Sequence, residues 1–485
     1  MSYIEFHSGP CLASIIDDVS CKYESSFGRL HIDVPTVPMT TQPLALVINV
    51  DRSGSMCDNC ADGQSKMQHI QHMLKNLMHV VAKQPGVSIK VCIVAFSHDV
   101  GNVFQNLPHW ELITDDDGFI HMSSDNVKFV CTAIDYIDPW GVTNLEKSLK
   151  YADEKMKTYQ NAHPDHRVIH IQLTDGEATS GSTIPAEMQQ YVDSSYKHIF
   201  VGVGDEHDSY LLNYLAEGSI LGEYRFIDQL DKSGWICGEI LYDLLYPYYP
   251  HHPIHIQMSP GSLIYDWRID QWVPMLTVPP FSGNRPKDYH VMNLEAEDET
   301  SISATVYSGM ELLEHVETLP LLMEDDDTHA IIPNDLTLPW LRYRTQVCMY
   351  LVTQHELKQN RSEFLNEEAS CDSLKQQLSE LLHALQHVSE HLDTTDASVD
   401  REFLQTLMDD VRISLELLGT QRGYMYTTCR QTSQGNQYAY TPATIVIVSA
   451  TTDDTVEYNH IHSPTGTNNS NMDMLSIMTQ VQGWM

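Results

Sequence analysis

The chain has 485 residues, more than one hydrophobic core accommodates, so we expect two to four domains. Its 28 Lys and Arg against 66 Asp and Glu give a formal net charge of −38. This charge repels nucleic-acid phosphates and anionic lipid headgroups, and no stretch approaches the roughly 18 apolar residues of a membrane helix. We therefore expect no nucleic-acid binding and no membrane insertion. The charge suits basic partners or simply keeps the protein in solution.

The cysteines and the first residues bear on the cellular compartment. Ten cysteines are spread along the chain without the dense spacing of a disulfide framework. The first residues, 1–7, lack the basic end and apolar stretch of a signal peptide. We therefore expect a cytoplasmic protein whose thiols are reduced.

Residues 1–42 contain a strand pattern at 30–34, which ends just before the first strand of the next domain. We expect this N-terminal strand to pair into a β-sandwich that is predicted further along the chain. The domain at 43–235 would then be inserted between sandwich strands.

Residues 43–235 alternate apolar strand patterns with amphipathic helix patterns. Several strands are apolar on both faces, which is typical of a parallel sheet covered by helices. Helices are expected at 67–81, after Thr143 and at 208–216, and the less regular segment 97–142 includes an edge strand at 101–104 and a helix at 124–136. The pattern predicts an α/β fold with a doubly wound, mostly parallel sheet, in which ligands bind beyond the carboxyl ends of the strands. The expected strands are 44–50, 88–96, 168–173, 198–203 and 224–227.

Five side chains that contain oxygen atoms lie near the expected ligand-binding edge of that sheet. Asp51, Ser53 and Ser55 follow the first strand directly, Asp175 follows the strand at 168–173, and Thr143 precedes a helix. Carboxylates and hydroxyls suit a hard divalent cation such as Mg²⁺ or Mn²⁺. Residues 51–55 therefore predict a divalent-cation site, and Asp175 offers a second carboxylate at a strand end.

The hydrophobic pattern is different in the rest of the chain. Short strand patterns separated by Pro, Gly and Asp predict a β-sandwich at 240–325. Three amphipathic patterns predict a helical segment at 338–422. Residues 423–485 are expected to form one strand at 441–450 and a mobile tail rich in Thr, Asn and Ser.

The five positions resemble the metal-ion-dependent adhesion site of von Willebrand factor A (VWA) domains. Residues 202–208 and 222–227 are similar to the end of such domains in inter-alpha-trypsin-inhibitor heavy chains and in plant VWA proteins with a RING finger. In that group a β-sandwich and a helical segment follow the VWA domain, and 423–431 resembles the segment that closes the helical part. This chain has no RING-like cluster of paired cysteines and histidines, so ubiquitin-ligase activity is not expected.

The resemblance implies a role for each site residue. Ser53, Ser55 and Thr143 would bind Mg²⁺ directly or nearly so, and Asp51 and Asp175 would bind it directly or through water. An Asp or Glu of a partner protein would complete the coordination. The expected function is a cation-dependent protein-binding module for adhesion or scaffolding, and not an enzyme.

The sequence is also compatible with other functions. One is a structural or assembly subunit with a vestigial metal site, and another is a ubiquitin-pathway adaptor without ligase activity. A hydrolase or ligase component that uses the cation as a Lewis acid is disfavoured, because no nucleophile elbow, P-loop or dinucleotide fingerprint is present.

Cys57 and Cys60 form a C-x-x-C pair directly after residues 51–55, the metal loop, and His69 and His72 follow on the next helix. Two thiolates and two imidazoles match a tetrahedral zinc site, and the pair alone could be redox-active. Two free loop thiols are the third interpretation, which we favour because 25 histidines make chance pairs common.

Overall fold

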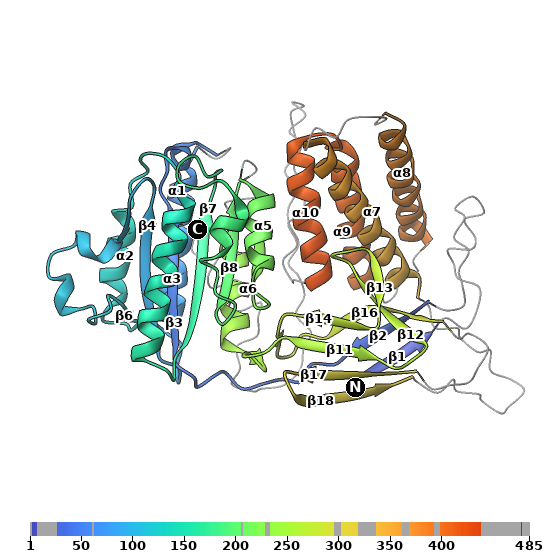
Figure 1. Cartoon of the computed structure of the whole chain (residues 1–485), viewed down its shortest axis with the longest axis horizontal. Helices are drawn as coiled ribbons and strands as arrows, with labels where there is room; N and C mark the ends of the chain where they lie inside the picture. Colours follow the sequence, from blue (N-terminus) through green and yellow to red (C-terminus); the bar gives the residue numbers. More distant parts are fainter. Residues whose placement is uncertain are drawn as a thin grey trace, which may run out of the picture.

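The computed structural model describes residues 2–6, 27–60, 63–204, 207–227, 233–294, 302–318, 336–360, 368–391, 398–437 and 477. Figure 1 shows three parts: a sheet covered by helices, a β-sandwich, and a group of long helices above the sandwich. None of the helices in the described ranges is long and apolar enough to cross a membrane.

The α/β domain is built on a seven-stranded sheet in the order β5-β4-β3-β7-β8-β9, with β6 also paired to β4. Strands β4, β3, β7, β8 and β9 run parallel to their neighbours, whereas β5 and β6 pair antiparallel with β4. The predicted α/β class with a mostly parallel sheet is confirmed. The strands are β3 (Leu44–Asp51), β4 (Ile89–Phe96), β5 (Val100–Asn102), β6 (Ile120–His121), β7 (Arg167–Thr174), β8 (Lys197–Val203) and β9 (Glu223–Ile227).

Helices cover both faces of this sheet because its strands are apolar on both sides. On β3, Leu46 and Ile48 belong to the core beneath α1 (Lys66–Val81), α2 (Val127–Asp135) and α6 (Ser233–Leu245). The alternate residues Ala45 and Val47 face the other side, where α3 (Leu145–Ala162) packs. Helices α4 (Pro185–Gln189) and α5 (Ser209–Glu217) complete that side.

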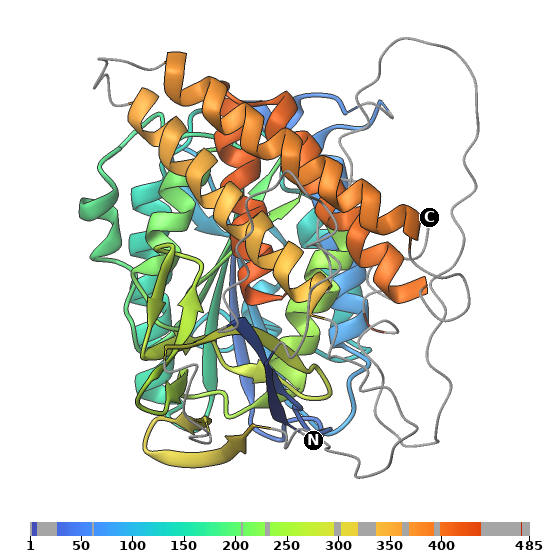
Figure 2. The same cartoon turned by 90° about the vertical axis from the view of Figure 1, so that its right-hand side faces the viewer.

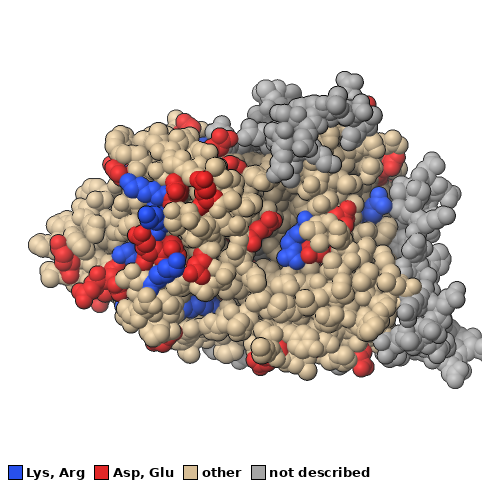
Figure 3. Space-filling model, in the orientation of Figure 1, with Lys and Arg blue, Asp and Glu red and all other residues tan. Residues whose placement is uncertain are grey.

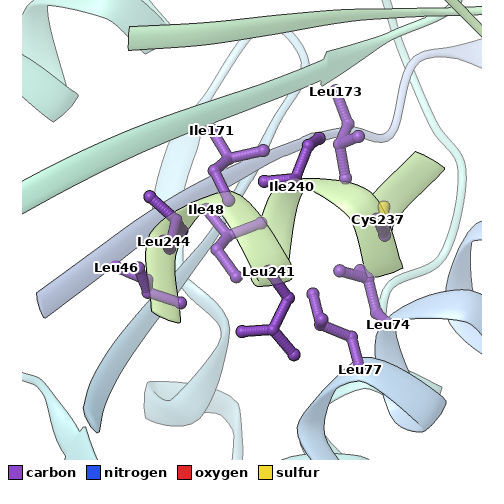
Figure 4. A pocket seen from close by; sticks show the side chains of 10 residues that line it. All are labelled: Leu46, Ile48, Leu74, Leu77, Ile171, Leu173, Cys237, Ile240, Leu241 and Leu244. Atoms are coloured by element: carbon purple, nitrogen blue, oxygen red, sulfur yellow. The ribbon is translucent and has the colours of Figure 1, made fainter. Parts of the chain in front are cut away.

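Helix α6 corrects the domain boundary predicted at residue 235. Ile240, Leu241 and Leu244 of α6 face Leu46 and the neighbouring apolar residues of β3, β7 and α1 around a small cavity of about 10 Å³ (Figure 4). The helix therefore belongs to the core of the α/β domain, which continues to 245. Its sequence is apolar almost all round, so it lacks the polar stripe by which a surface helix is recognised.

The β-sandwich has two antiparallel sheets that share one core. Strand β2 pairs with β16 from Ile32↔Lys287 to Phe27↔Met292, so the N-terminal strand does lie in the sandwich. The first sheet contains β1 (Tyr3–Phe6), β2 (Phe27–Ile32), β16 (Lys287–Asn293), β12 (Ser262–Asp266) and β13 (Gln271–Val273). The second contains β14 (Met275–Val278), β11 (Ile254–Met258), β17 (Ser303–Ser308) and β18 (Glu311–Glu317), and β10 (Pro247–Tyr248) pairs separately with β15 (Phe281–Ser282).

The helical segment consists of α7 (Thr337–Asn360), α8 (Glu368–His391), α9 (Ser398–Glu416) and α10 (Gln421–Asn436). Figure 2 shows these helices crossing in front of the α/β domain. The predicted boundary at 422/423 is wrong, because α10 continues through it. Met425 and Tyr426 of α10 pack against α5 and β9, which explains why this stretch is helical despite its weak amphipathic pattern. The predicted strand at 441–450 and the tail beyond it lie outside the described residues, apart from Ile477.

Candidate metal centre

The two carboxylates of the predicted site lie at the ends of neighbouring strands. Strand β3 pairs parallel with β7 up to Val50↔Leu173, so Asp51 and Asp175 emerge at the same edge of the sheet. Both side chains are almost fully buried. The register therefore brings together two acids that are more than a hundred residues apart in sequence.

The hydroxyls of the loop after β3 connect these acids. The loop begins with Ser53 and turns into a short 3₁₀ helix, Gly54–Cys57. The Ser53 amide donates to Asp51 Oδ1 over 2.8 Å. The Oγ atoms of Ser53 and Ser55 lie 3.1 Å apart, and Ser55 Oγ donates to Asp175 Oδ1 over 2.8 Å.

Thr143 joins from a third segment. The Gly54 amide donates to the Gly141 carbonyl over 2.9 Å, which fixes the loop that carries Thr143 to the metal loop. A Cβ atom added to Gly176 would lie 3.6 Å from Thr143 Oγ1 and 3.7 Å from Ser55 Oγ. The two hydroxyls therefore flank the same glycine beside Asp175, and all five predicted residues are brought to one place.

The electrostatics of Asp51 set the chemistry of the site. Burial, and to a lesser extent the nearby charge of Asp175, raise the pKa of Asp51 to about 6. Hydrogen bonds from Thr174 and Ser53 act in the opposite direction, since both stabilise the carboxylate. A divalent cation bound between the two carboxylates would offset their mutual repulsion.

The donor set fits a hard cation. Two carboxylates and three hydroxyls provide oxygen ligands only, which matches Mg²⁺ or Mn²⁺. By contrast, the described residues contain no group of three or more His, Cys, Asp or Glu that could hold a metal ion. Cys57, Cys60, His69 and His72 are thus not assembled into a zinc site, and His72 instead lies 3.1 Å from the Asn76 amide.

Comparison with known proteins agrees with this geometry. Residues 46–177 match the family model of the von Willebrand factor type A domain. The α/β domain is a VWA domain. No curated protein matches the sequence, and the resemblance to inter-alpha-trypsin-inhibitor heavy chains stays a prediction.

Solved structures are similar to this chain at low sequence identity. A von Willebrand factor type A protein from Catenulispora acidiphila is similar with a TM-score of 0.53 and 13% identity, over 84% of this chain and 92% of that one. The ArnB paralog VWA2 from Sulfolobus acidocaldarius has a TM-score of 0.42 and 12% identity, over 84% and 93% of the two chains. The proximal thread matrix protein 1 of the mussel byssus, with a zinc-occupied MIDAS (metal-ion-dependent adhesion site) motif, has a TM-score of 0.30 and 17% identity. The match covers 41% of this chain and 46% of that one.

The VWA domain also contains a charged neighbour of the site that sequence reasoning missed. Lys66 is the first residue of α1, whose N-terminus is fixed by a capping box between Ser65 and Gln68. Its Nζ donates to Asp175 Oδ2 over 3.0 Å, and its side chain is only 10% exposed. A fixed cation thus occupies one oxygen of a predicted metal-ligating carboxylate.

Replacing Lys66 by Met should tighten Mn²⁺ binding by about tenfold, or about 1.4 kcal/mol. The substitution removes a positive charge that repels the incoming cation and competes for Asp175, but it keeps most of the aliphatic stem. Isothermal titration calorimetry with Mn²⁺ measures the effect. Lys75→Met, on the same helix, removes an exposed ion pair with Asp135 (2.7 Å) and should leave the affinity unchanged. Weaker binding by the Lys66 variant would mean that the lysine supports the site.

Apolar side chains border the metal loops. Trp140 and Val142 are 58% and 46% exposed, on the segment that leads into Thr143. The Trp140 amide donates to the Arg52 carbonyl, and its ring packs edge-on against His98 with centroids 4.2 Å apart. The exposed tryptophan is therefore fixed directly beside the metal loop. Trp140 and Val142 thus form a small exposed apolar pair beside the candidate site.

Proposed function

We propose that this chain is a cation-dependent protein-binding module, whose metal site receives an acidic side chain of a partner protein. The observation that carries the proposal is the convergence of Asp51, Ser53, Ser55, Thr143 and Asp175 at one edge of the sheet. VWA domains are commonly protein-binding modules, which agrees with this interpretation.

The donor set explains why an acidic partner is favoured. Mg²⁺ or Mn²⁺ would be held by the three hydroxyls, with Asp51 and Asp175 bound directly or through water. Because Mg²⁺ takes six oxygen ligands and most of these donors are neutral, the cation stays attractive to a further carboxylate. A partner's Asp or Glu supplies it.

We also propose that the role is binding and not catalysis. Catalytic sites enclose their substrates, since reacting groups must be shielded from water. Three cavities that are lined by described residues lie in the VWA core and at the domain junctions, and none of these three includes a metal-site side chain.

The surface beside the site specifies the partner further. Trp140 and Val142 would contact apolar residues next to the partner's acid, and large aromatic side chains often dominate binding energy. Because the chain carries a net charge of −38, it repels acidic proteins at long range. Association with an acidic partner should therefore be slow at low salt and faster as salt screens the repulsion.

Affinity capture from native lysate tests the proposal. Partners that are retained in Mg²⁺ should be released by EDTA and should be lost with Thr143→Ala, which removes one hydroxyl without disturbing either acid. Trp140→Ala should weaken the same interaction by about tenfold or more. A partner that binds equally well in EDTA or to the Thr143 variant would favour a structural subunit with a vestigial metal site.

A further inference from the structure

A cavity of about 200 Å³ lies where the three parts of the molecule meet. Its wall includes Tyr214 of α5, Arg268 of the turn between β12 and β13, Tyr350 of α7 and Gln431 of α10. Figure 3 shows the surface hollowed between the VWA half and the half formed by sandwich and helices. The cavity shares no residue with the metal centre, so it represents a separate feature.

The lining has an unusual composition. None of the described residues that line the cavity is aliphatic. Besides the aromatic side chains, the wall offers amides, hydroxyls, one carboxylate and one guanidinium. The aromatic members are Tyr210, Tyr214, Trp267, Tyr350 and Tyr424. A gap left by imperfect domain packing would be expected to expose some of the aliphatic residues that dominate protein interiors.

The wall is held in place by contacts of its own. Gln431 Nε2 donates to the Trp267 carbonyl over 2.6 Å, which fixes the sandwich turn to α10. A Cβ atom at Gly435 would lie 1.9 Å from the Trp267 indole nitrogen, so only glycine permits this close packing. Asn213 donates to Glu217 over 2.9 Å along α5. A preformed wall lowers the ordering cost of binding a ligand.

The charges in the wall disfavour ionic ligands. The Arg268 guanidinium makes two hydrogen bonds of 2.8 Å to Asp266, so its charge is already balanced. The Glu217 carboxylate adds a negative charge, which disfavours a phosphate or carboxylate ligand. A cationic ligand is also disfavoured, because Arg268 lies over the Trp267 ring at 5.3 Å and takes the place of such a cation.

Size and ring geometry narrow the choice among neutral ligands. The volume is below the roughly 300 Å³ at which pockets for drug-sized molecules begin. The Tyr210 and Tyr214 rings are tilted by 39° with centroids 6.2 Å apart, so they do not form a parallel slot for a flat heteroaromatic base. A lipid tail would need the aliphatic wall that this cavity lacks.

A sugar satisfies these constraints. The C–H face of a sugar ring packs on Tyr or Trp rings, and its hydroxyls bond with amides, hydroxyls and carboxylates. The wall also contains a buried hydroxyl that the protein leaves unused: Thr353 Oγ1 has no hydrogen-bond partner among the described residues. We propose that the junction cavity binds a neutral sugar of about monosaccharide size, and that the bound sugar stabilises the contact between the three parts.

Saturation-transfer NMR on the full chain tests this proposal with glucose, galactose, mannose, N-acetylglucosamine and xylose as probes. At least one of these sugars should bind, and the same sugar should raise the thermal unfolding midpoint. Glucose 6-phosphate, choline and adenosine serve as the anionic, cationic and flat aromatic alternatives. Binding should persist in EDTA, which separates this site from the proposed metal function.

Variants of one tyrosine locate the site. Tyr214→Ala should weaken sugar binding by about tenfold, whereas Tyr214→Phe should bind within a factor of two to three, because the ring and not its hydroxyl makes the stack. Tyr136→Ala, at an exposed position outside the cavity, is the matched control and should bind as the wild type does. Failure of all five sugars to bind, equal binding by Tyr214→Ala, or preference for a charged or flat aromatic probe would overturn the proposal.

Discussion

Replacing both Asp51 and Asp175 by Ala should reduce Mg²⁺ and Mn²⁺ affinity by more than about 100-fold, beyond detection by calorimetry. The two acids are the only negatively charged members of the proposed donor set. Losses of 10–100-fold are typical when residues that merely orient metal ligands are changed, so removal of the ligands themselves should cost more. Calorimetric titration of wild type and variant with each metal measures the change.

The fold must be kept intact for this test to be decisive. Loss of Asp175 removes the 3.0 Å partner of the Lys66 ammonium and leaves the more distant Asp58 carboxylate, at 3.9 Å, to balance its charge. Breaking a buried ion pair in this way is destabilising. The triple variant Lys66→Met/Asp51→Asn/Asp175→Asn removes the acids and the lysine charge together. It should also fail to bind metal, with a circular dichroism spectrum like that of the wild type. Equal metal binding by wild type and the double Ala variant would reject the site.

Much of the metal centre could be predicted from the sequence because its chemistry lies at strand ends. Asp51 and Asp175 each follow a strongly apolar run, and parallel pairing then brings such ends together. Thr143 was found only through the family resemblance, since a single Thr before a helix has no distinctive local signal. The geometry of Gly176 places its hydroxyl beside Ser55.

Features that depend on long-range packing could not be predicted. From the sequence, Lys66 would be interpreted as an ordinary exposed residue at the start of a helix, and only the fold places its ammonium beside Asp175. Helix α10 has few apolar residues in its pattern, yet it is buried by contacts with α5, β9, α7 and α9. Local periodicity does not contain that information.

A buried ionic network connects the VWA domain to its neighbours. Arg225 of β9 contacts Glu223 at 2.9 Å, Glu239 of α6 at 3.0 Å and Asp243 at 3.0 Å. From the sandwich side, Arg285 contacts Glu239 at 2.7 Å and Asp243 at 3.0 Å. Arg285 also donates to the Gln437 carbonyl after α10, so the network joins all three parts of the molecule.

Replacing Arg225 by Met should lower the free energy of unfolding by about 3 kcal/mol. Breaking a buried ion pair typically costs 3–5 kcal/mol, because the remaining charge stays buried without compensation. We expect the lower end of that range, since Arg285 still balances Glu239 and Asp243, and Lys197 still pairs with Glu223. Urea unfolding followed by circular dichroism measures the loss.

Two further variants separate charge and geometry from a general effect of losing an arginine. Arg225→Lys keeps the charge but not the planar guanidinium that bonds three acids at once, so its loss of stability should be intermediate. Arg412→Met removes an ion pair with Asp409 in which the arginine is 47% exposed, and it should change stability by less than about 1 kcal/mol. If Arg225→Met were as stable as Arg412→Met, the acids around Arg225 would be neutral or hydrated in the folded protein, and the network would not hold the three parts together.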